Sequence, residues 1–339
     1  MNSNLLPTKQ AACNTVDLMK FVLALVVVGI HIHPLPEPYY TYSWGVFGRL
    51  AVPFFFIASS YFFFRRSPNT SDLKRYVVRL LKMYLFWFIF TAPLTVMQQF
   101  TSPHGDLASK ILIFIRNFFF GSTFKGSWFL MALIINIPIV YYLKKINSVY
   151  LLILGFLITL ILVCDTSFRI FMPHNIDFLF NSLDSFYAND MGTSSHTAFV
   201  YIVIGKIIAE KVVEKATTNK PRLTMMMTIS LILLYVDATV VMSLSGNNAY
   251  LLWQIPVASL LFLVALVNNT NAKMPYKDLR KISIIIYISH FIMQWILDYA
   301  GAKGYPYPPT ARYLIAVSCC IALGYIIIKL KFPTLRKSQ

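Results

Sequence analysis

Residues 17–34 of the chain are DLMKFVLALVVVGIHIHP, an apolar run with ionisable side chains at both ends. A helix needs about 20 mostly apolar residues to cross the hydrocarbon core of a bilayer, and this run comes close to that length. It contains a lysine and has no small-residue cleavage pattern, so we interpret it as an uncleaved first span rather than a secretory signal.

The rest of the chain is equally apolar. Hydrophobic residues make up 57% of the 339 residues and charged residues 13%, with a mean hydropathy of +0.63. An average soluble domain carries roughly 25% charged residues, so this composition excludes a soluble enzyme and a disordered chain. The net charge is +17, but the lysines and arginines cluster between apolar runs, unlike those of a nucleic-acid-binding protein. The four cysteines have neither metal-ligand spacing nor a disulfide pattern, and we expect no metal.

Ten segments are long and apolar enough, or nearly so, to be predicted as membrane-spanning helices. They are residues 17–34, 46–64, 78–98, 125–143, 149–165, 194–211, 222–242, 249–268, 282–300 and 310–330. The predicted fold is therefore all-α, a polytopic membrane protein that forms one transmembrane domain over residues 1–339. The shorter apolar run 111–120 predicts an interfacial or re-entrant helix.

The loops between these segments differ in charge. With the N-terminus inside, most lysines and arginines fall on the inner side, including the basic tail 331–339. The positive-inside rule then predicts that both termini are cytoplasmic. The outer segment 166–193 is a long polar loop, which predicts either a lid or binding loop or a flexible connector.

Ionisable side chains at membrane depth are costly, so each is a candidate functional residue. In the first span, Lys20 and His31 are eleven residues apart, about 16 Å along a helix and on nearly the same face. Asp17 lies three residues before Lys20 and is predicted to pair with it. His31 is either a catalytic imidazole or an outer-interface histidine hydrogen-bonded to a neighbour.

A basic stripe opens the third span, where Arg75, Arg79 and Lys82 recur at helical spacing. Such a stripe suits either a phosphate-rich ligand from the cytoplasm or anionic membrane lipids.

Four further polar or aromatic residues lie within or at the ends of later spans. Trp128 is either an interfacial aromatic residue or part of a binding site. Asp237, Tyr287 and His290 are either buried polar contacts between helices or the lining of an outward-facing cavity.

Together these elements resemble the acyltransferase family 3 proteins, which are bacterial integral-membrane acyltransferases. The family motifs correspond, in family order, to Lys20-x10-His31, Phe55-Phe56-Ile-Ala-Ser59-Ser60, Arg79-Leu-Leu-Lys82, Trp128-Phe129-Leu130 and Ser283 to His290 with Tyr287. Three positions depart from the pattern: Lys20 and Lys82 stand where the family has arginine, and Ser60 stands where it has glycine. Charge is kept in both basic replacements, but the bidentate fork of arginine is lost.

The first two spans also look like the membrane half of the membrane-bound serine racemases of vancomycin resistance, which belongs to the same superfamily and has been regarded as a serine-uptake module. The matching stretches are His31-x-His33-Pro34-Leu35 and Ala51-Val-Pro-Phe-Phe-Phe56. We expect no racemase domain after Gln339.

The resemblance implies an enzyme of the bacterial cytoplasmic (inner) membrane that moves an acyl group, with acetyl expected, from cytoplasmic acyl-CoA to a hydroxyl of a cell-surface glycan or its lipid-linked precursor. His31 would be the general base, and Lys20, steadied by Asp17, would orient the donor. The implied binding residues are Arg75, Arg79 and Lys82 for the CoA phosphates, and Trp128, Asp237, Tyr287 and His290 for the acceptor. Two alternatives stay open: a transporter of a small polar solute such as serine, and a catalytically inactive membrane partner protein.

Overall fold

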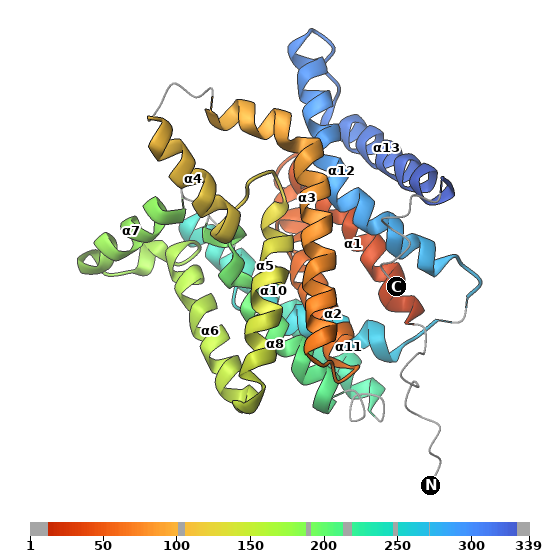
Figure 1. Cartoon of the computed structure of the whole chain (residues 1–339). Coiled ribbons are helices and arrows are strands. Elements are labelled where there is room, and N and C mark those ends of the chain that lie inside the picture. Colours follow the sequence, from red (N-terminus) through yellow and green to blue (C-terminus); the bar gives the residue numbers. More distant parts are fainter. Residues whose placement is uncertain are drawn as a thin grey trace.

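The computed structural model describes residues 13–100, 106–187, 191–212, 219–246, 250–270 and 272–330. Within these ranges the chain is built from helices and contains no strand, which confirms the all-α fold class. Figure 1 shows the long helices gathered side by side, with α4 and α7 standing out on one side of the bundle. The predicted basic tail 331–339 lies outside the described residues.

The helices follow the apolar runs closely. In chain order they are α1 (Asn14–Ile32), α2 (Ala51–Phe64), α3 (Thr70–Phe100), α4 (Leu107–Phe120), α5 (Ser127–Tyr142), α6 (Ser148–Asp165), α7 (Asp177–Tyr187), α8 (Phe199–Ile207), α10 (Lys220–Ser245), α11 (Gln254–Val267), α12 (Tyr276–Ala302) and α13 (Pro309–Lys329). Short 3₁₀ and π segments join several of them, and the π segment Thr41–Gly45 leads toward α2.

Among the described residues, seven segments are long and apolar enough to cross a membrane, so the chain is a multi-pass membrane protein. They are Asn14–Ile32, Thr41–Phe64, Ser127–Lys145, Ser148–Asp165, Lys220–Ser245, Tyr276–Ala302 and Pro309–Lys329.

The prediction of ten spans is not confirmed. The three remaining expected segments are helical, but α3 carries lysines and arginines in its first half, and α8 and α11 are short. The 14 residues of α11 extend only about 21 Å, less than the thickness of the hydrocarbon core. The cytoplasmic position of both termini stays a prediction.

The segments expected outside the spans have their own structure. α4 covers the run 111–120, and several of its large apolar side chains are exposed, as an interfacial helix requires. The expected loop 166–193 contains α7, and Arg169 ties its start to the end of α6 through an ion pair to Asp165 at 2.7 Å. The described part of this segment is therefore largely helical rather than an irregular loop.

Two helix pairs bring the important side chains together. α1 and α12 pack side by side and run parallel, because Asp17 contacts Arg280 near their starts and the Gln294 side chain donates to the His31 carbonyl oxygen further along. α2 and α8 approach closely at Gly205, which small residues permit in membrane helices. α13 packs alongside α12 (Figure 1) and also contacts α1.

Candidate active site

One regular helix carries the two residues on which the sequence analysis centred. α1 is α-helical from Asn14 to Ile32, so Lys20 and His31 project from nearly the same face about 16 Å apart. The helix ends at His33, which adopts a left-handed conformation with φ of 53° and whose backbone N–H donates to the Gly29 carbonyl oxygen. This ending closes the last turn of α1, in which His31 lies, and the Gln294 side chain of α12 donates to the His31 carbonyl oxygen.

His31 lies beside a second histidine, from α12. The His31 ring centroid is 5.3 Å from that of His290 and 4.7 Å from that of Phe291. His31 is exposed, whereas His290 is completely buried. The structure therefore pairs an accessible imidazole with an inaccessible one.

The buried histidine has a defined tautomer. Its Nδ1 lies 3.0 Å from the Ile286 carbonyl oxygen, and a carbonyl can only accept, so Nδ1 carries the proton when the ring is neutral. Nε2 is then a hydrogen-bond acceptor, and no partner for it is found among the described residues. A buried acceptor without a partner is costly, which is why such groups often face a substrate or a water molecule.

Tyr287 fixes the neighbouring helix end. Its hydroxyl donates to the Gly126 carbonyl oxygen at 3.3 Å, just before α5 begins. Gly126 has φ of +81°, and a Cβ there would lie 2.4 Å from a ring carbon of Phe291. Only glycine fits this close approach, because both the backbone conformation and the space exclude a side chain.

Aromatic rings continue this site toward Trp128. The Tyr287 ring lies 5.1 Å from Phe129, Phe129 lies 4.7 Å from Phe56, and Phe56 lies 5.7 Å from Trp128. Trp128, Tyr287, His290 and His31 therefore belong to one connected cluster from α1, α2, α5 and α12. The cluster combines aromatic rings with a small number of polar groups, the kinds of side chain that line small-molecule sites.

The other end of α1 holds a cluster of charges. Lys20 is half-buried, and its Nζ lies 4.5 Å above the Phe62 ring. Asp17 is buried and pairs with Arg280 of α12 at 3.5 Å. The parallel packing of α1 and α12 brings Arg280 to the carboxylate. Among the described residues Lys20 makes no direct ion pair with Asp17, but the two lie close enough for their charges to attract.

The basic stripe lies on the outer face of α3, apart from Lys20. Arg75 has 74% of its side chain exposed and pairs with Asp72 at 2.5 Å. Arg79 is exposed and lies over the Tyr76 ring, and Lys82 is exposed as well. These side chains can meet a ligand at the surface, but the structure does not join them to the histidine pair.

Asp237 also lies apart from the cluster. It sits on α10 against the backbone N–H groups of Leu252 and Trp253, at the start of α11. A carboxylate in this position accepts from the free donors of a helix N-terminus. Its Oδ2 atom is buried and has no hydrogen-bond partner among the described residues.

Sequence reasoning missed Phe291, Gly126 and Arg280. Phe291 and Gly126 adjoin residues that were singled out, but nothing in the sequence shows that they touch each other. Arg280 belongs to a basic cluster that the sequence explains as an inner-loop anchor. Within the described ranges, no group of three or more His, Cys, Asp or Glu side chains is placed to hold a metal ion.

Comparison with known families gives one match. The model of a family described as an acyltransferase domain matches residues 14–329 of this chain. The match covers the histidine cluster, the charged end of α1 and the stripe of α3. No solved structure matches the chain.

Two curated relatives are named as racemases. An amino-acid racemase from Enterococcus faecalis is 26% identical over 336 residues, which cover 94% of this chain and 46% of the relative. A serine/alanine racemase from Enterococcus gallinarum is 26% identical over 296 residues, covering 81% of this chain and 40% of the relative. The chain thus spans less than half the length of these relatives.

Proposed function

The chain belongs to the acyltransferase domain family, as its motifs had indicated, and from this premise we propose that it is an acyl-CoA-dependent O-acyltransferase of the bacterial cytoplasmic membrane. The donor is acyl-CoA, with acetyl expected, and it arrives from the cytoplasm. The acceptor is a hydroxyl of a cell-surface glycan or of its lipid-linked precursor.

One observation carries the proposal: an accessible His31 stands beside the buried His290, whose Nε2 has no hydrogen-bond partner in the described part of the chain, in a cluster of aromatic rings. Imidazole is the side chain most often used to accept a proton in acyl transfer. His31 takes the proton of the acceptor hydroxyl, whose oxygen attacks the thioester carbonyl carbon. The C–O bond forms, the C–S bond breaks, and the proton passes to the departing CoA thiolate.

The surrounding side chains have distinct roles in this proposal. Tyr287, His290 and Trp128 shape the acceptor side, and the Tyr287 bond to Gly126 holds the start of α5 in place. Asp237 supports the fold of this region through its contacts with α11.

The cationic side chains at the charged end of α1 also support the proposal. Lys20 approaches the donor while the Asp17–Arg280 ion pair holds α1 against α12. The exposed stripe of Arg75, Arg79 and Lys82 attracts the CoA phosphates to the protein surface.

The test is the release of CoA. Purified protein in detergent, given acetyl-CoA and candidate glycan acceptors, is expected to release free CoA, and His31→Ala is expected to abolish this release. His33→Ala is the matched control, because His33 lies two residues away and packs on Tyr40 rather than on His290. Loss of activity in both variants, or in neither, contradicts the assigned role of His31.

The second candidate is transport of a small polar solute. It rests on the resemblance of the first two spans to the membrane half of serine racemases, and two curated relatives are named as an amino-acid racemase and a serine/alanine racemase. Proteoliposomes that take up labelled serine without any release of CoA would replace the acyltransferase proposal with this one. The acyltransferase proposal is supported if neither wild type nor His31→Ala takes up serine and only wild type releases CoA.

A further inference from the structure

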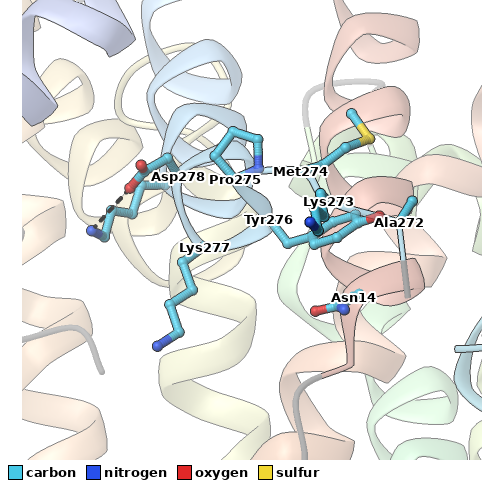
Figure 2. Close-up of a pocket in the computed structure, with 9 residues that line it drawn as sticks. Asn14, Ala272, Lys273, Met274, Pro275, Tyr276, Lys277 and Asp278 are labelled. Carbon is cyan, nitrogen blue, oxygen red and sulfur yellow. Dashed lines mark hydrogen bonds and ion pairs between the residues drawn. The ribbon is translucent and has the colours of Figure 1, made fainter. Parts of the chain in front are cut away.

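A cavity of about 490 Å³ opens where α1 and α12 begin (Figure 2). It is lined by residues 272–278, Lys281 and Asn14. None of these residues belongs to the basic stripe or to the histidine cluster. The Asn14 amide donates to the Thr270 carbonyl oxygen at 2.8 Å, which holds the start of α1 against the segment that precedes α12.

The cavity is positively charged. Three lysines line it against a single aspartate, Asp278, which pairs with Lys281 at 3.4 Å. Lys273 and Lys277 are exposed, and no acidic partner for either is recorded in the described part of the chain. The cavity also lies at the N-terminus of a 27-residue helix, where the helix dipole favours an anion; the backbone N–H groups of Tyr276 and Asp278 already donate to backbone carbonyl oxygens, so side chains have to supply most of the donors.

A buried hydroxyl adds an independent indication of a ligand. Tyr276 lines the cavity and is only 6% exposed, yet its hydroxyl has no hydrogen-bond partner among the described residues. A buried hydroxyl without a partner lowers stability, so its presence is explained if a ligand completes the hydrogen bond. A phosphate oxygen is an acceptor that suits both this hydroxyl and the two unpaired lysines.

The cavity and the histidine pair lie at different levels along the same two helices. α1 and α12 run parallel from the cavity toward His31 and His290. Tyr276 and His290 lie on one helix 14 residues apart, which corresponds to about 21 Å along its axis. Acyl-CoA has the matching layout, with nucleotide phosphates at one end and the thioester at the other end of a long flexible arm.

We propose that this cavity binds the phosphates of the acyl-CoA donor, with Lys273, Lys277 and the Tyr276 hydroxyl as hydrogen-bond donors. The inference rests on the proposed function for the identity of the ligand. The stripe on α3 then attracts the donor to the surface, and the cavity holds its phosphates while the thioester reaches His31. An anionic lipid headgroup offers the same phosphate chemistry, and the experiment separates the two sources.

The experiment measures binding rather than turnover. The full-length protein is placed in nanodiscs of phosphatidylcholine alone, and the dissociation constants of CoA and of inorganic pyrophosphate are measured by calorimetry. We expect both ligands to bind and pyrophosphate to compete with CoA. Lys273→Gln with Lys277→Gln is expected to weaken both ligands by about tenfold or more, the loss typical of a charge-assisted hydrogen bond.

One control variant and one further test variant make the result specific. Lys144→Gln with Lys145→Gln removes another exposed lysine pair from the predicted inner surface and is expected to leave binding unchanged. Tyr276→Phe is expected to weaken pyrophosphate binding by about tenfold while leaving the melting temperature of the ligand-free protein equal or higher, because it removes a hydroxyl without a partner.

Three results overturn parts of this inference in distinguishable ways. Unchanged CoA binding in the Lys273/Lys277 variant, with weakened binding in Arg79→Gln with Lys82→Gln, refutes the cavity but leaves the proposed function intact. Binding of pyrophosphate but not CoA by wild type refutes the donor and the proposed function together. If wild type does not bind CoA, and if it loses pyrophosphate binding when phosphatidylglycerol is added to the nanodiscs, the cavity binds a lipid headgroup instead.

Discussion

Replacing Gly126 with alanine tests the geometry of the histidine cluster directly. The new Cβ would lie 2.4 Å from a ring carbon of Phe291, at a residue with φ of +81°. A normal contact requires the ring to move by roughly 1 Å, and overpacking of this kind costs about 1–3 kcal/mol. The left-handed conformation adds about 1–2 kcal/mol for a residue with a side chain.

The displaced ring matters because Phe291 packs on both histidines. Its centroid is 3.9 Å from that of His290 and 4.7 Å from that of His31. A misplacement of about 1 Å at a catalytic group reduces the rate about 100-fold, so Gly126→Ala should release CoA about 100 times more slowly.

The assay compares initial rates of CoA release and thermal midpoints in the same detergent. Gly301→Ala is the matched control, because Gly301 lies near the end of the same helix as Phe291 and an added Cβ there meets nothing within 4 Å. That variant should retain the wild-type rate. A Gly126→Ala protein with the wild-type rate and midpoint would refute the assignment of this cluster as the reaction site.

Two further predictions concern the framework that holds the site. Ser60→Ala removes the hydrogen bond to the Ile202 carbonyl oxygen and should lower the free energy of unfolding by about 1 kcal/mol. Gly205→Ala places a Cβ 2.5 Å from a backbone oxygen and should lower it by about 1–3 kcal/mol. A lower thermal midpoint for Gly205→Ala than for Ser60→Ala supports the packing of α2 on α8, and a higher one contradicts it. At the start of α3, the Asp72 carboxylate accepts a hydrogen bond from the Asn69 backbone N–H, and this bond holds the pKa of Asp72 below its usual value. The ionised Asp72 therefore stabilises the folded protein above about pH 4, and this stabilisation is lost as the pH falls further. The stability difference between wild type and Asp72→Asn should therefore shrink toward low pH, and a constant difference from pH 7 to pH 3 would argue against this role.

The sequence predicts the helices well because the bilayer requires long apolar runs and nearly every such run is a helix here. Prediction from the sequence is less successful for short or charged segments. The apolar run that contains α11 predicts a membrane span, but α11 has only 14 helical residues. The stretch 166–193 reads as a polar loop, yet α7 forms within it. Local composition does not show where a helix ends, because the end also depends on contacts with neighbouring helices and on ion pairs such as Arg169–Asp165.

The site is predicted only in part, since helix periodicity relates residues on one helix but not on two. Lys20 and His31 could be placed on one face of α1 from spacing alone. The contact of His31 with His290 could not be predicted, because it depends on α1 choosing α12 as a parallel neighbour. The same choice gives Asp17 its partner Arg280, although Lys20 is nearer in sequence. Several ion pairs among the described residues join side chains three or four positions apart, as helical spacing predicts, but a pair between two helices such as Asp17–Arg280 cannot be predicted from spacing.

The structure also bears on the three positions that differ from the family pattern. Lys20 lies over the Phe62 ring, and an ammonium makes this contact without the bidentate fork of arginine. Ser60 is fully buried, but its hydroxyl donates to Ile202, and Gly205 supplies the small residue that the close helix contact needs. Lys82 is exposed, so it can meet a phosphate as a point charge. Each replacement is therefore accommodated by its surroundings, and none of the three argues against catalytic activity.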